Sequence, residues 1–276
     1  ENGQEMPNGR RRCLSACRRI LTIIDPNRRS IMSDDRRMAV LIDAENVSER
    51  YLKAIFEELT NYSVKVTNKR IYGDFTNPQM AAWKKVLLDY SIIPVQQYSY
   101  TTGKNATDSA LIIDAMDLLY SGSVDAFCII SSDSDFTRLA ARLREAGMFV
   151  MGMGERKTPK PFIAACENFK YLEVISGEED GKKENSKNSK KEQENELTYI
   201  TKVIERLIAE SGDEDGYLFL GKVGTMLQKM QPDFDVRNYG FSRLSQLINA
   251  SGNFTVQKRT NGKDPTPQIY IKAKKR

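Results

Sequence analysis

The sequence predicts a doubly wound α/β domain with a mostly parallel sheet, followed by a small winged helix-turn-helix domain. Short apolar runs alternate with helical patterns over roughly 140 residues, which is typical of an α/β sheet. Several of these runs break directly into acidic side chains, most sharply where AFCII passes into SSDSDF at Ala126–Phe136. Further along the chain, three helical patterns precede two short strands, which is the order of a winged helix.

The strands and helices of the α/β domain are expected within residues 37–176. A short, fully apolar run that precedes a helical pattern is typical of a buried strand in a parallel sheet. The expected strands are Met38–Ile42, Asn68–Phe75, Ile92–Gln97, Ala126–Ile130, Phe149–Gly152 and Tyr171–Ile175. The expected helices are Ser48–Asn61, Pro78–Tyr90, Asp108–Tyr120, Asp135–Ala146 and a short one at Pro161–Glu167.

The remaining parts of the chain differ in composition from this domain. Residues 1–36 are rich in arginine and lack a hydrophobic period, so we expect a disordered basic extension. Residues 177–196 contain no large apolar side chain and are expected to form a flexible charged linker. The winged-helix domain is expected at residues 197–276, with helices at Leu197–Glu210, Leu220–Lys229 and Phe241–Ala250 and strands at Phe254–Lys258 and Gln268–Ile271.

The net charge of +5 is distributed unevenly along the chain. Residues 1–37 carry nine arginines against five acids, and residues 257–276 carry seven basic residues against one acid. Residues 38–175 are nearly balanced, with fifteen basic and seventeen acidic residues. The basic ends could grip nucleic acid electrostatically or could be solvated tails. No apolar run approaches the roughly 18 residues of a membrane span, so none is predicted.

The numbers and positions of cysteine and histidine residues limit the kinds of catalysis and metal site that the chain can form. The four cysteines show no metal-binding spacing, and a reducing cytoplasm is the expected compartment. The chain contains no histidine, which excludes Ser-His-Asp and Cys-His catalysis and zinc sites with imidazole ligands. Any reaction must therefore use carboxylates, metal ions, lysines or hydroxyl groups.

Four aspartates are expected to converge at one edge of the sheet. Asp43 follows the first strand, Asp133 and Asp135 follow the fourth, and Asp108 opens the helix between the third and fourth strands. In a doubly wound sheet the ligand crevice lies beyond the carboxyl ends of the strands, where strands one and four flank the switch point. Two ionised carboxylates about 5 Å apart repel by roughly 3 kcal/mol at an effective dielectric near 20, so the cluster needs a counterion.

A hard divalent cation, Mg²⁺ or Mn²⁺, is the counterion that carboxylate oxygens favour. Asn46, one turn after Asp43, adds a neutral oxygen beside it. A metal-filled acidic crevice without histidine favours hydrolysis of a phosphodiester. The alternative interpretation is structural: Ser132 or Asp133 caps the following helix, whose first turn favours an acid.

Other polar residues near these strands are weaker candidates for the predicted site. Lys104, four residues before Asp108, could neutralise a substrate phosphate or be a solvated loop lysine. Asp74 ends the second strand and is favoured as a turn residue over a residue at the rim of the site. Asp114 and Asp117 share a helix with Asp108 but point elsewhere, and are interpreted as surface or capping acids.

The motifs MAVLIDAEN, KNATDSALIIDAMDLL and IISSDSDFTRLAARLREAG resemble the NYN domain of the LabA-like group within the PIN-like nucleases. The resemblance covers about residues 37–176 and implies a PIN-like sheet with metal-dependent ribonuclease chemistry. The family's acidic positions fall on residues that are all present here, Asp43, Asp108, Asp133 and Asp135, with Asn46 beside them. Ser132 is expected to contact the substrate with Asn46 and Lys104.

The segment LFLGKVGTMLQKMQPDFDVRNYGFSRLSQLINASGNFTV resembles an OST-HTH, or LOTUS, domain. This resemblance implies RNA binding or docking of a protein partner, and the sequence leaves both open. The candidates for phosphate contact are Arg237, Arg243, Lys258 and Arg259, each of which could instead be a solvated surface residue. The residues expected to form apolar core are Phe234, Tyr239, Phe241, Leu244 and Leu247.

Two functions from different classes follow. The favoured one is a metal-dependent ribonuclease, using Mg²⁺ or Mn²⁺, whose LOTUS domain brings the RNA. The alternative is a non-catalytic RNA-binding adaptor in which the acidic crevice holds a metal structurally. An aspartyl phosphatase is disfavoured, because it needs a second Asp two residues after its nucleophile and Asp43 is followed by Ala44 and Glu45. No membrane partner is expected, and a homodimer is left open.

Overall fold

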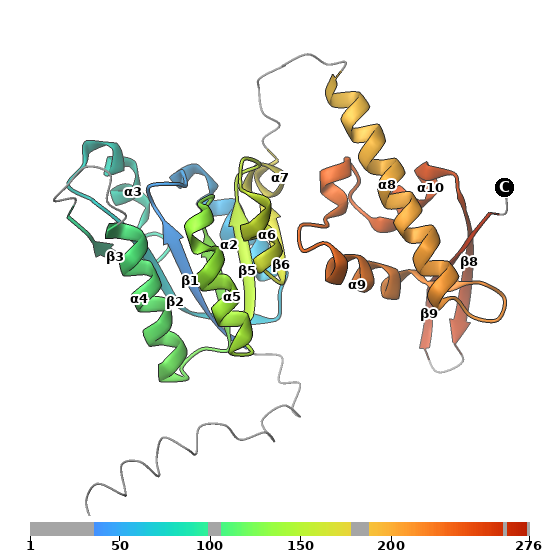
Figure 1. Ribbon diagram of the computed structural model, residues 1–276, viewed down its shortest axis with the longest axis horizontal. Coiled ribbons are helices and arrows are strands. Elements are labelled where there is room, and N and C mark those ends of the chain that lie inside the picture. The colour runs from blue at the N-terminus through green and yellow to red at the C-terminus, as the bar shows by residue number, and fades with distance from the viewer. Residues whose placement is uncertain (1–35, 99–105, 178–187, 262–263, 275–276) are drawn as a thin grey trace, which may run out of the picture. The chain divides into compact units, whose positions relative to one another are not determined.

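The computed structural model describes residues 36–98, 106–177, 188–261 and 264–274 (Figure 1). Lys104 and residues 1–35 of the extension expected at residues 1–36 lie outside these residues, and Arg36 belongs to the first strand. The first domain is built on a parallel sheet with the strand order β3-β2-β1-β4-β5-β6. Its strands are β1 (Arg36–Asp43), β2 (Val64–Gly73), β3 (Ile93–Gln96), β4 (Ala126–Ile130), β5 (Phe149–Gly154) and β6 (Asn168–Tyr171).

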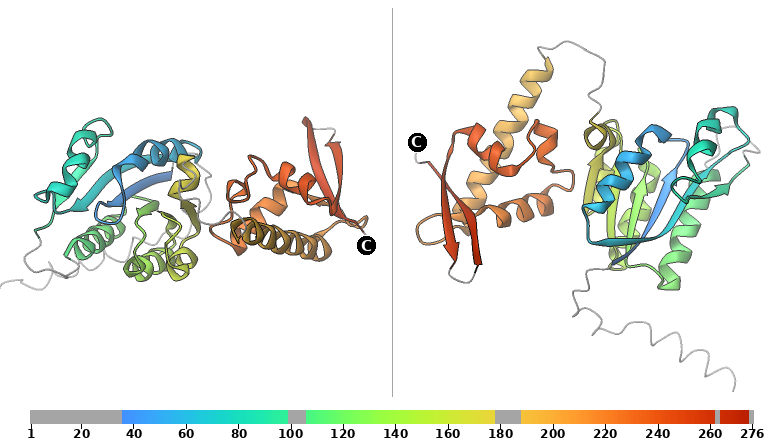
Figure 2. Two further views of the ribbon diagram at one scale, coloured as in Figure 1. Left: turned by 90° about the horizontal axis from the view of Figure 1, so that it is seen from above. Right: turned by 180° about the vertical axis from the view of Figure 1, so that it is seen from behind.

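Helices cover both faces of this sheet, which confirms the predicted doubly wound fold (Figure 2). The side chains of Tyr51, Leu52 and Trp83 form the core on one face, and those of Leu111 and Phe162 lie in the core on the other. The first face carries η2 (Glu49–Tyr51), α2 (Leu52–Thr60), η3 (Pro78–Met80), α3 (Ala81–Val86) and α7 (Leu172–Ser176). The second carries α4 (Ala106–Ser121), η4 (Ser134–Phe136), α5 (Thr137–Glu145) and α6 (Lys160–Ala165).

The strand order places the ends of β1 and β4 side by side. Leu41 pairs with Ile129 and Ile42 with Ile130, so Asp43 and Ser131 leave the sheet at the same edge. The chain crosses to β2 on one side of this pair and to β5 on the other. This is the switch point where the strands open a crevice for a ligand, and it is where the sequence places its acids.

Gly154 at the end of β5 allows a close approach beside this crevice. A Cβ atom on Gly154 would lie 2.6 Å from the carbonyl oxygen of Ser131 and 2.5 Å from the hydroxyl oxygen of Thr158. Only glycine fits this spacing without displacing a neighbour. The end of β5 therefore packs directly against the loop that follows β4.

The sixth strand differs from the prediction. It runs over Asn168–Tyr171, and the segment expected to be a strand, Tyr171–Ile175, forms most of helix α7 instead. Short apolar runs do not distinguish a strand from a helical turn by pattern alone. Here the buried side chain of Leu172 packs on the α2 face, which decides in favour of the helix.

The second domain contains three main helices and a three-stranded antiparallel sheet in the order β7-β9-β8, which confirms the small winged-helix architecture. The core includes all five residues expected there: Phe234 and Leu247 are buried, and Tyr239, Phe241 and Leu244 pack against them. Its elements are α8 (Asn188–Ser211), β7 (Leu218–Phe219), α9 (Leu220–Met230), η5 (Val236–Tyr239), α10 (Leu244–Ser251), β8 (Phe254–Asn261) and β9 (Asp264–Ala273).

Helix α8 begins inside the segment predicted to be a flexible linker. It starts at Asn188, whereas the pattern of apolar residues predicted a start at Leu197. The intervening segment NSKKEQENE lacks apolar residues but is rich in Lys, Glu and Gln, which are good helix formers. The helix propensity of this segment therefore explains why α8 begins before Leu197, where no hydrophobic periodicity predicts a helix. None of the helices in the described part of the chain has the length and apolar character that crossing a bilayer requires.

Candidate metal centre

Three carboxylates meet at the switch point. Asp108 comes from the first turn of α4, and Asp133 and Asp135 come from the segment after β4. One oxygen of each lies within 4.8 Å of one oxygen of each of the others. We call these three residues the acidic trio. Their oxygen donors suit a hard divalent cation, which would also relieve the repulsion between them.

Asp43 lies beside the acidic trio but is held differently. It is fully buried, and its Oδ2 accepts hydrogen bonds from the hydroxyl of Ser131 at 2.7 Å and from the side-chain amide of Asn46 at 2.8 Å. Its Oδ1 accepts from the backbone N–H of Glu45 at 3.0 Å. Burial raises the pKa of Asp43, and the hydrogen bonds from Ser131 and Asn46 oppose that rise. Asn46 thus contacts Asp43 through its amide nitrogen.

Ser131 joins the two strands that supply the acids. Its hydroxyl donates to Asp43 on β1 and accepts a hydrogen bond of 3.0 Å from the backbone N–H of Asp133. The residue is fully buried, so both contacts are shielded from water. Sequence reasoning missed this role, although Ser131 is the first polar residue after the buried run AFCII, at the edge shared with Asp43.

Asp133 combines the two interpretations that the sequence left open. Its Oδ1 accepts a hydrogen bond of 2.9 Å from the backbone N–H of Asp135, so it caps η4, and it also belongs to the acidic trio. Ser132 is nearly buried, and its hydroxyl accepts a hydrogen bond of 2.9 Å from the backbone N–H of Glu155. That contact ties the loop after β4 to the end of β5.

The surroundings of the cluster shift the pKa of Asp108. Burial raises its pKa to about 6, and the charges of Asp43, Asp133, Glu45 and Asp135 add to the rise. Glu45 is an acid that sequence reasoning left out of the site. It follows Asp43 by two residues and accepts a hydrogen bond of 2.9 Å from the hydroxyl of Thr107, next to Asp108.

The acidic residues Asp74, Asp114 and Asp117 lie outside this cluster. Asp74 accepts hydrogen bonds from the backbone N–H of Thr76 at 3.0 Å and from the side chain of Gln96 at 2.8 Å, which is the turn role favoured by the sequence. Asp117 is exposed, as expected. Asp114 is not a surface acid: it is half-buried and contacts β2.

Two of the four basic residues expected to contact phosphate are held by acids. Arg237 donates to Glu58 at 2.9 Å and to Asp235 at 2.7 Å. Arg259 donates to Asp213 at 2.7 Å, and its guanidinium lies over the rings of Tyr217 and Tyr270, 4.7 and 4.6 Å from their centroids. The other two basic residues, Arg243 and Lys258, are exposed.

The ion pair of Asp235 predicts an acid-sensitive contribution to stability. Burial raises the pKa of Asp235, but the hydrogen bonds from Arg237 and the charge of Lys170 outweigh it and lower the pKa to about 2. Because the folded pKa is depressed, this stabilisation is present above the unfolded pKa of about 4 and is lost as pH falls through about 2. We expect the difference in unfolding free energy between the parent and Asp235→Asn to shrink by about 2 kcal/mol over that range. Urea unfolding at each pH measures this difference, and a pH-independent difference would contradict the assignment.

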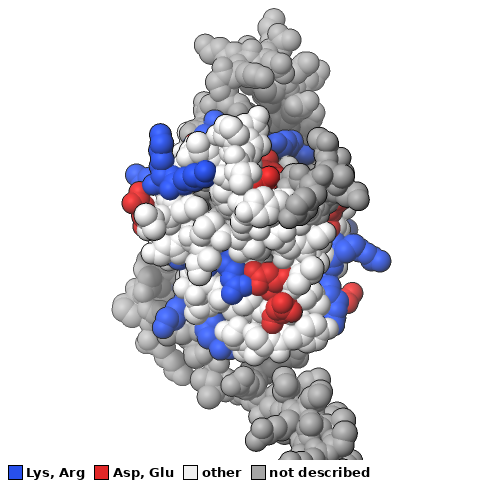
Figure 3. All heavy atoms as spheres, turned by 90° about the vertical axis from the view of Figure 1, so that its left-hand side faces the viewer, with Lys and Arg blue, Asp and Glu red and all other residues white. Residues whose placement is uncertain are grey.

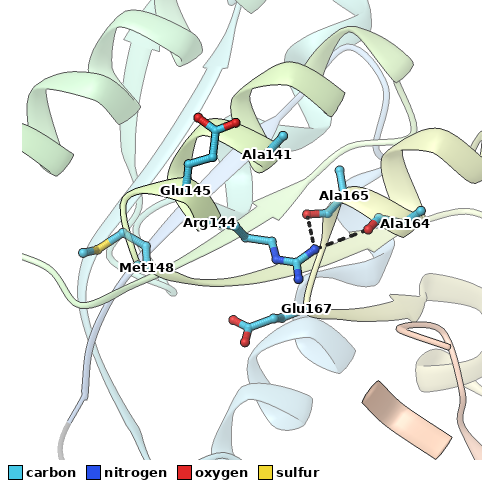
Figure 4. Close-up of a pocket in the computed structure, with 8 residues that line it drawn as sticks. Ala141, Arg144, Glu145, Met148, Ala164, Ala165 and Glu167 are labelled. Carbon is cyan, nitrogen blue, oxygen red and sulfur yellow. Dashed lines mark hydrogen bonds between the residues drawn. The ribbon is translucent and has the colours of Figure 1, made fainter. Parts of the chain in front are cut away.

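One hollow on the first domain lies away from the acids. It is bordered by the ends of α5 and α6, where Arg144 donates to the carbonyl oxygens of Ala164 and Ala165 (Figure 4). These residues precede β5 and β6, so the hollow lies at the amino ends of the strands. The side of the molecule that carries β3 and α4 shows scattered Lys and Arg side chains and a group of Asp and Glu side chains among uncharged residues (Figure 3).

The fold and the acidic edge define an α/β protein of the nuclease type joined to a winged helix. Residues 37–173 match the family model of the NYN domain, and residues 195–266 match that of the OST-HTH/LOTUS domain. The chain therefore carries an NYN domain followed by an OST-HTH/LOTUS domain, which confirms the resemblances in the sequence. The first implies a nuclease-type fold and the second implies RNA binding.

Comparison with individual proteins adds little to this assignment. A search of curated proteins found no match to the chain. Among solved structures, the chain is similar to a protein of unknown function from Vibrio parahaemolyticus, with 20% identity and a TM-score of 0.41. That similarity covers 50% of this chain and 94% of the Vibrio protein.

Proposed function

We propose that the protein is a metal-dependent ribonuclease that hydrolyses RNA phosphodiester bonds at the acidic trio, with its OST-HTH/LOTUS domain binding the RNA. The observation that carries the proposal is the convergence of three carboxylate oxygens within 4.8 Å at the switch point of the sheet. Asp43 adds a fourth negative charge that raises the pKa of Asp108. A cluster of like charges in a crevice, with one pKa raised to about 6, is characteristic of functional sites.

Asp108, Asp133 and Asp135 would hold Mg²⁺ or Mn²⁺ through their oxygens. When bound, such a cation supplies Lewis-acid activation of water and screens the charge of the phosphate. Asp43 keeps the site negative, and the hydrogen bonds from Ser131 and Asn46 hold its carboxylate in one orientation. The tight packing of Gly154 against the Ser131 carbonyl keeps the loop after β4 close to the end of β5.

The two cysteines in the described part of the first domain are buried in its core. Cys128 and Cys166 are both free and buried. Burial raises the pKa of Cys166 to about 12, which leaves its thiol unreactive. We propose a cytoplasmic location from the cysteine spacing of the sequence and not from these two buried thiols.

Cleavage of labelled RNA, with DNA of the same sequence alongside, tests the proposal. We expect the full chain to cut the RNA in Mg²⁺ or Mn²⁺ and to lose that activity in EDTA, because the carboxylates alone provide no Lewis acid. The matched control is Asp117→Asn, which removes an exposed acid from the helix that carries Asp108 and should cut at the parent rate. RNA binding without cleavage in any metal would overturn the proposal and favour the adaptor.

A further inference from the structure

Helix α4 is anchored to β2 of the sheet by polar contacts of Asp114. The carboxylate of Asp114 accepts a hydrogen bond from the hydroxyl of Tyr72 and forms an ion pair with Arg70, both on β2. Tyr72 is fully buried, and Asp114 and Arg70 are partly buried. Burial raises the pKa of Tyr72, as does the adjacent Asp114 carboxylate, so its hydroxyl stays protonated and donates.

Apolar packing alone does not fix how α4 lies on the sheet. Leu111, Ala115 and Leu118 face the core, but the helix also carries large apolar side chains on its outer side. Ile113 is 62% exposed and Tyr120 is 68% exposed. Because its apolar residues extend beyond the side that faces the core, α4 could bury a similar apolar surface in more than one rotation. A polar contact that only one arrangement satisfies selects among them, which is the best-supported role of polar groups in apolar interfaces.

The same helix brings Asp108 to the acidic trio. Asp108 lies six residues before Asp114, which is about 9 Å along the axis at about 1.5 Å per residue. A slip of α4 by one residue would move Asp108 by about 1.5 Å and rotate it by about 100°, enough to take it out of a cluster whose oxygens lie within 4.8 Å.

The anchor and Asp43 also lie on neighbouring, paired strands. Tyr72 is the register partner of Asp43 on β1, and its carbonyl oxygen accepts a hydrogen bond of 3.0 Å from the backbone N–H of Ala44. The contacts of Asp114 thus fix α4 to β2, and β2 is paired with β1, which carries Asp43. Arg70 and Asp114 balance each other's charge, so the anchor adds no net charge near the site.

We infer that Asp114, with Tyr72 and Arg70, is a positioning group that sets the register of α4 and thereby places Asp108 in the acidic trio. The inference rests on the proposed metal site. It predicts that loss of the anchor weakens metal binding even though none of its three residues belongs to the trio. Changes in residues that orient metal ligands typically cost ten- to a hundredfold in metal affinity.

Titration of the full chain with Mn²⁺ tests this inference. We expect Asp114→Ala to lower the Mn²⁺ affinity at least tenfold and Asp114→Asn to lower it less, because asparagine keeps an acceptor for Tyr72 but loses the charge that faces Arg70. Asp117→Ala, one turn further along the same helix and exposed, is the matched control and should bind Mn²⁺ like the parent. Far-UV circular dichroism at the titration temperature shows that each variant is folded.

The outcomes separate this inference from the proposed function. If Asp114→Ala does not fold, Tyr72→Phe removes only the buried hydroxyl and should still weaken Mn²⁺ binding severalfold. Folded variants that bind Mn²⁺ as tightly as the parent would overturn the positioning role and leave the ribonuclease proposal standing. A parent chain that binds no Mn²⁺ would overturn both. A purely structural role for Asp114 would lower the melting temperature without changing the affinity of the folded protein.

Discussion

Asp135→Asn is expected to lower the single-turnover rate of RNA cleavage by about a thousandfold. Asp135 is an exposed member of the acidic trio, so its replacement removes a proposed cation ligand without disturbing the core. Loss of about 4 kcal/mol of transition-state stabilisation corresponds to that factor. RNA affinity measured without divalent metal should stay the same or improve, because the proposed site would lose a negative charge that repels phosphate.

Asp43→Asn should reduce the rate as well, but with a second effect that Asp135→Asn lacks. Asp43 is fully buried and accepts hydrogen bonds on both oxygens. Asparagine would turn an amide N–H toward donors such as Ser131 or Glu45, which leaves a buried donor without an acceptor and costs about 1–3 kcal/mol of stability. Urea unfolding of both variants beside the kinetic assay separates the two effects. If Asp43→Asn and Asp135→Asn both cleave at the parent rate, the nuclease proposal is wrong and the activity comes from a contaminant.

Removal of the OST-HTH/LOTUS domain is expected to weaken RNA binding at least tenfold while the saturated cleavage rate changes little. The NYN domain has its own apolar cores on both faces of its sheet, so a fragment of residues 36–176 should fold. Glu58 and Lys170 lose Arg237 and Asp235 as partners, but in the fragment their charges become hydrated. The measurements are RNA affinity in EDTA and single-turnover cleavage over a range of RNA concentrations in Mg²⁺.

Two variants of the full chain serve as controls for the deletion. Arg243→Ala and Lys258→Ala remove exposed cations from the OST-HTH/LOTUS domain and should each weaken RNA binding by part of the amount seen in the deletion. The loss should be larger at low salt, since released counterions drive such contacts. If the fragment folds but cuts no RNA at saturating concentration, the OST-HTH/LOTUS domain is itself part of the active site.

The sequence by itself determined the architecture and the place of the site. Local patterns are strong in the buried strands: AFCII is apolar throughout because both faces of β4 are covered. The alternation of strands and helices then implies a parallel sheet, and the switch point follows from its connectivity. That reasoning brings Asp108, Asp133 and Asp135 together from separate parts of the chain, as the structure does.

The tertiary structure alone decided what each polar side chain contacts. Ser131 contacts Asp43 across 88 residues of sequence, and Arg237 contacts Glu58 across 179. Such pairs depend on packing between distant elements, and no local pattern encodes them. For the same reason the sequence alone predicts Asp114, which points away from Asp108 as the helical period requires, to be a surface or capping acid. The period gives its direction on α4, but only the neighbouring β2 shows that Tyr72 and Arg70 lie there.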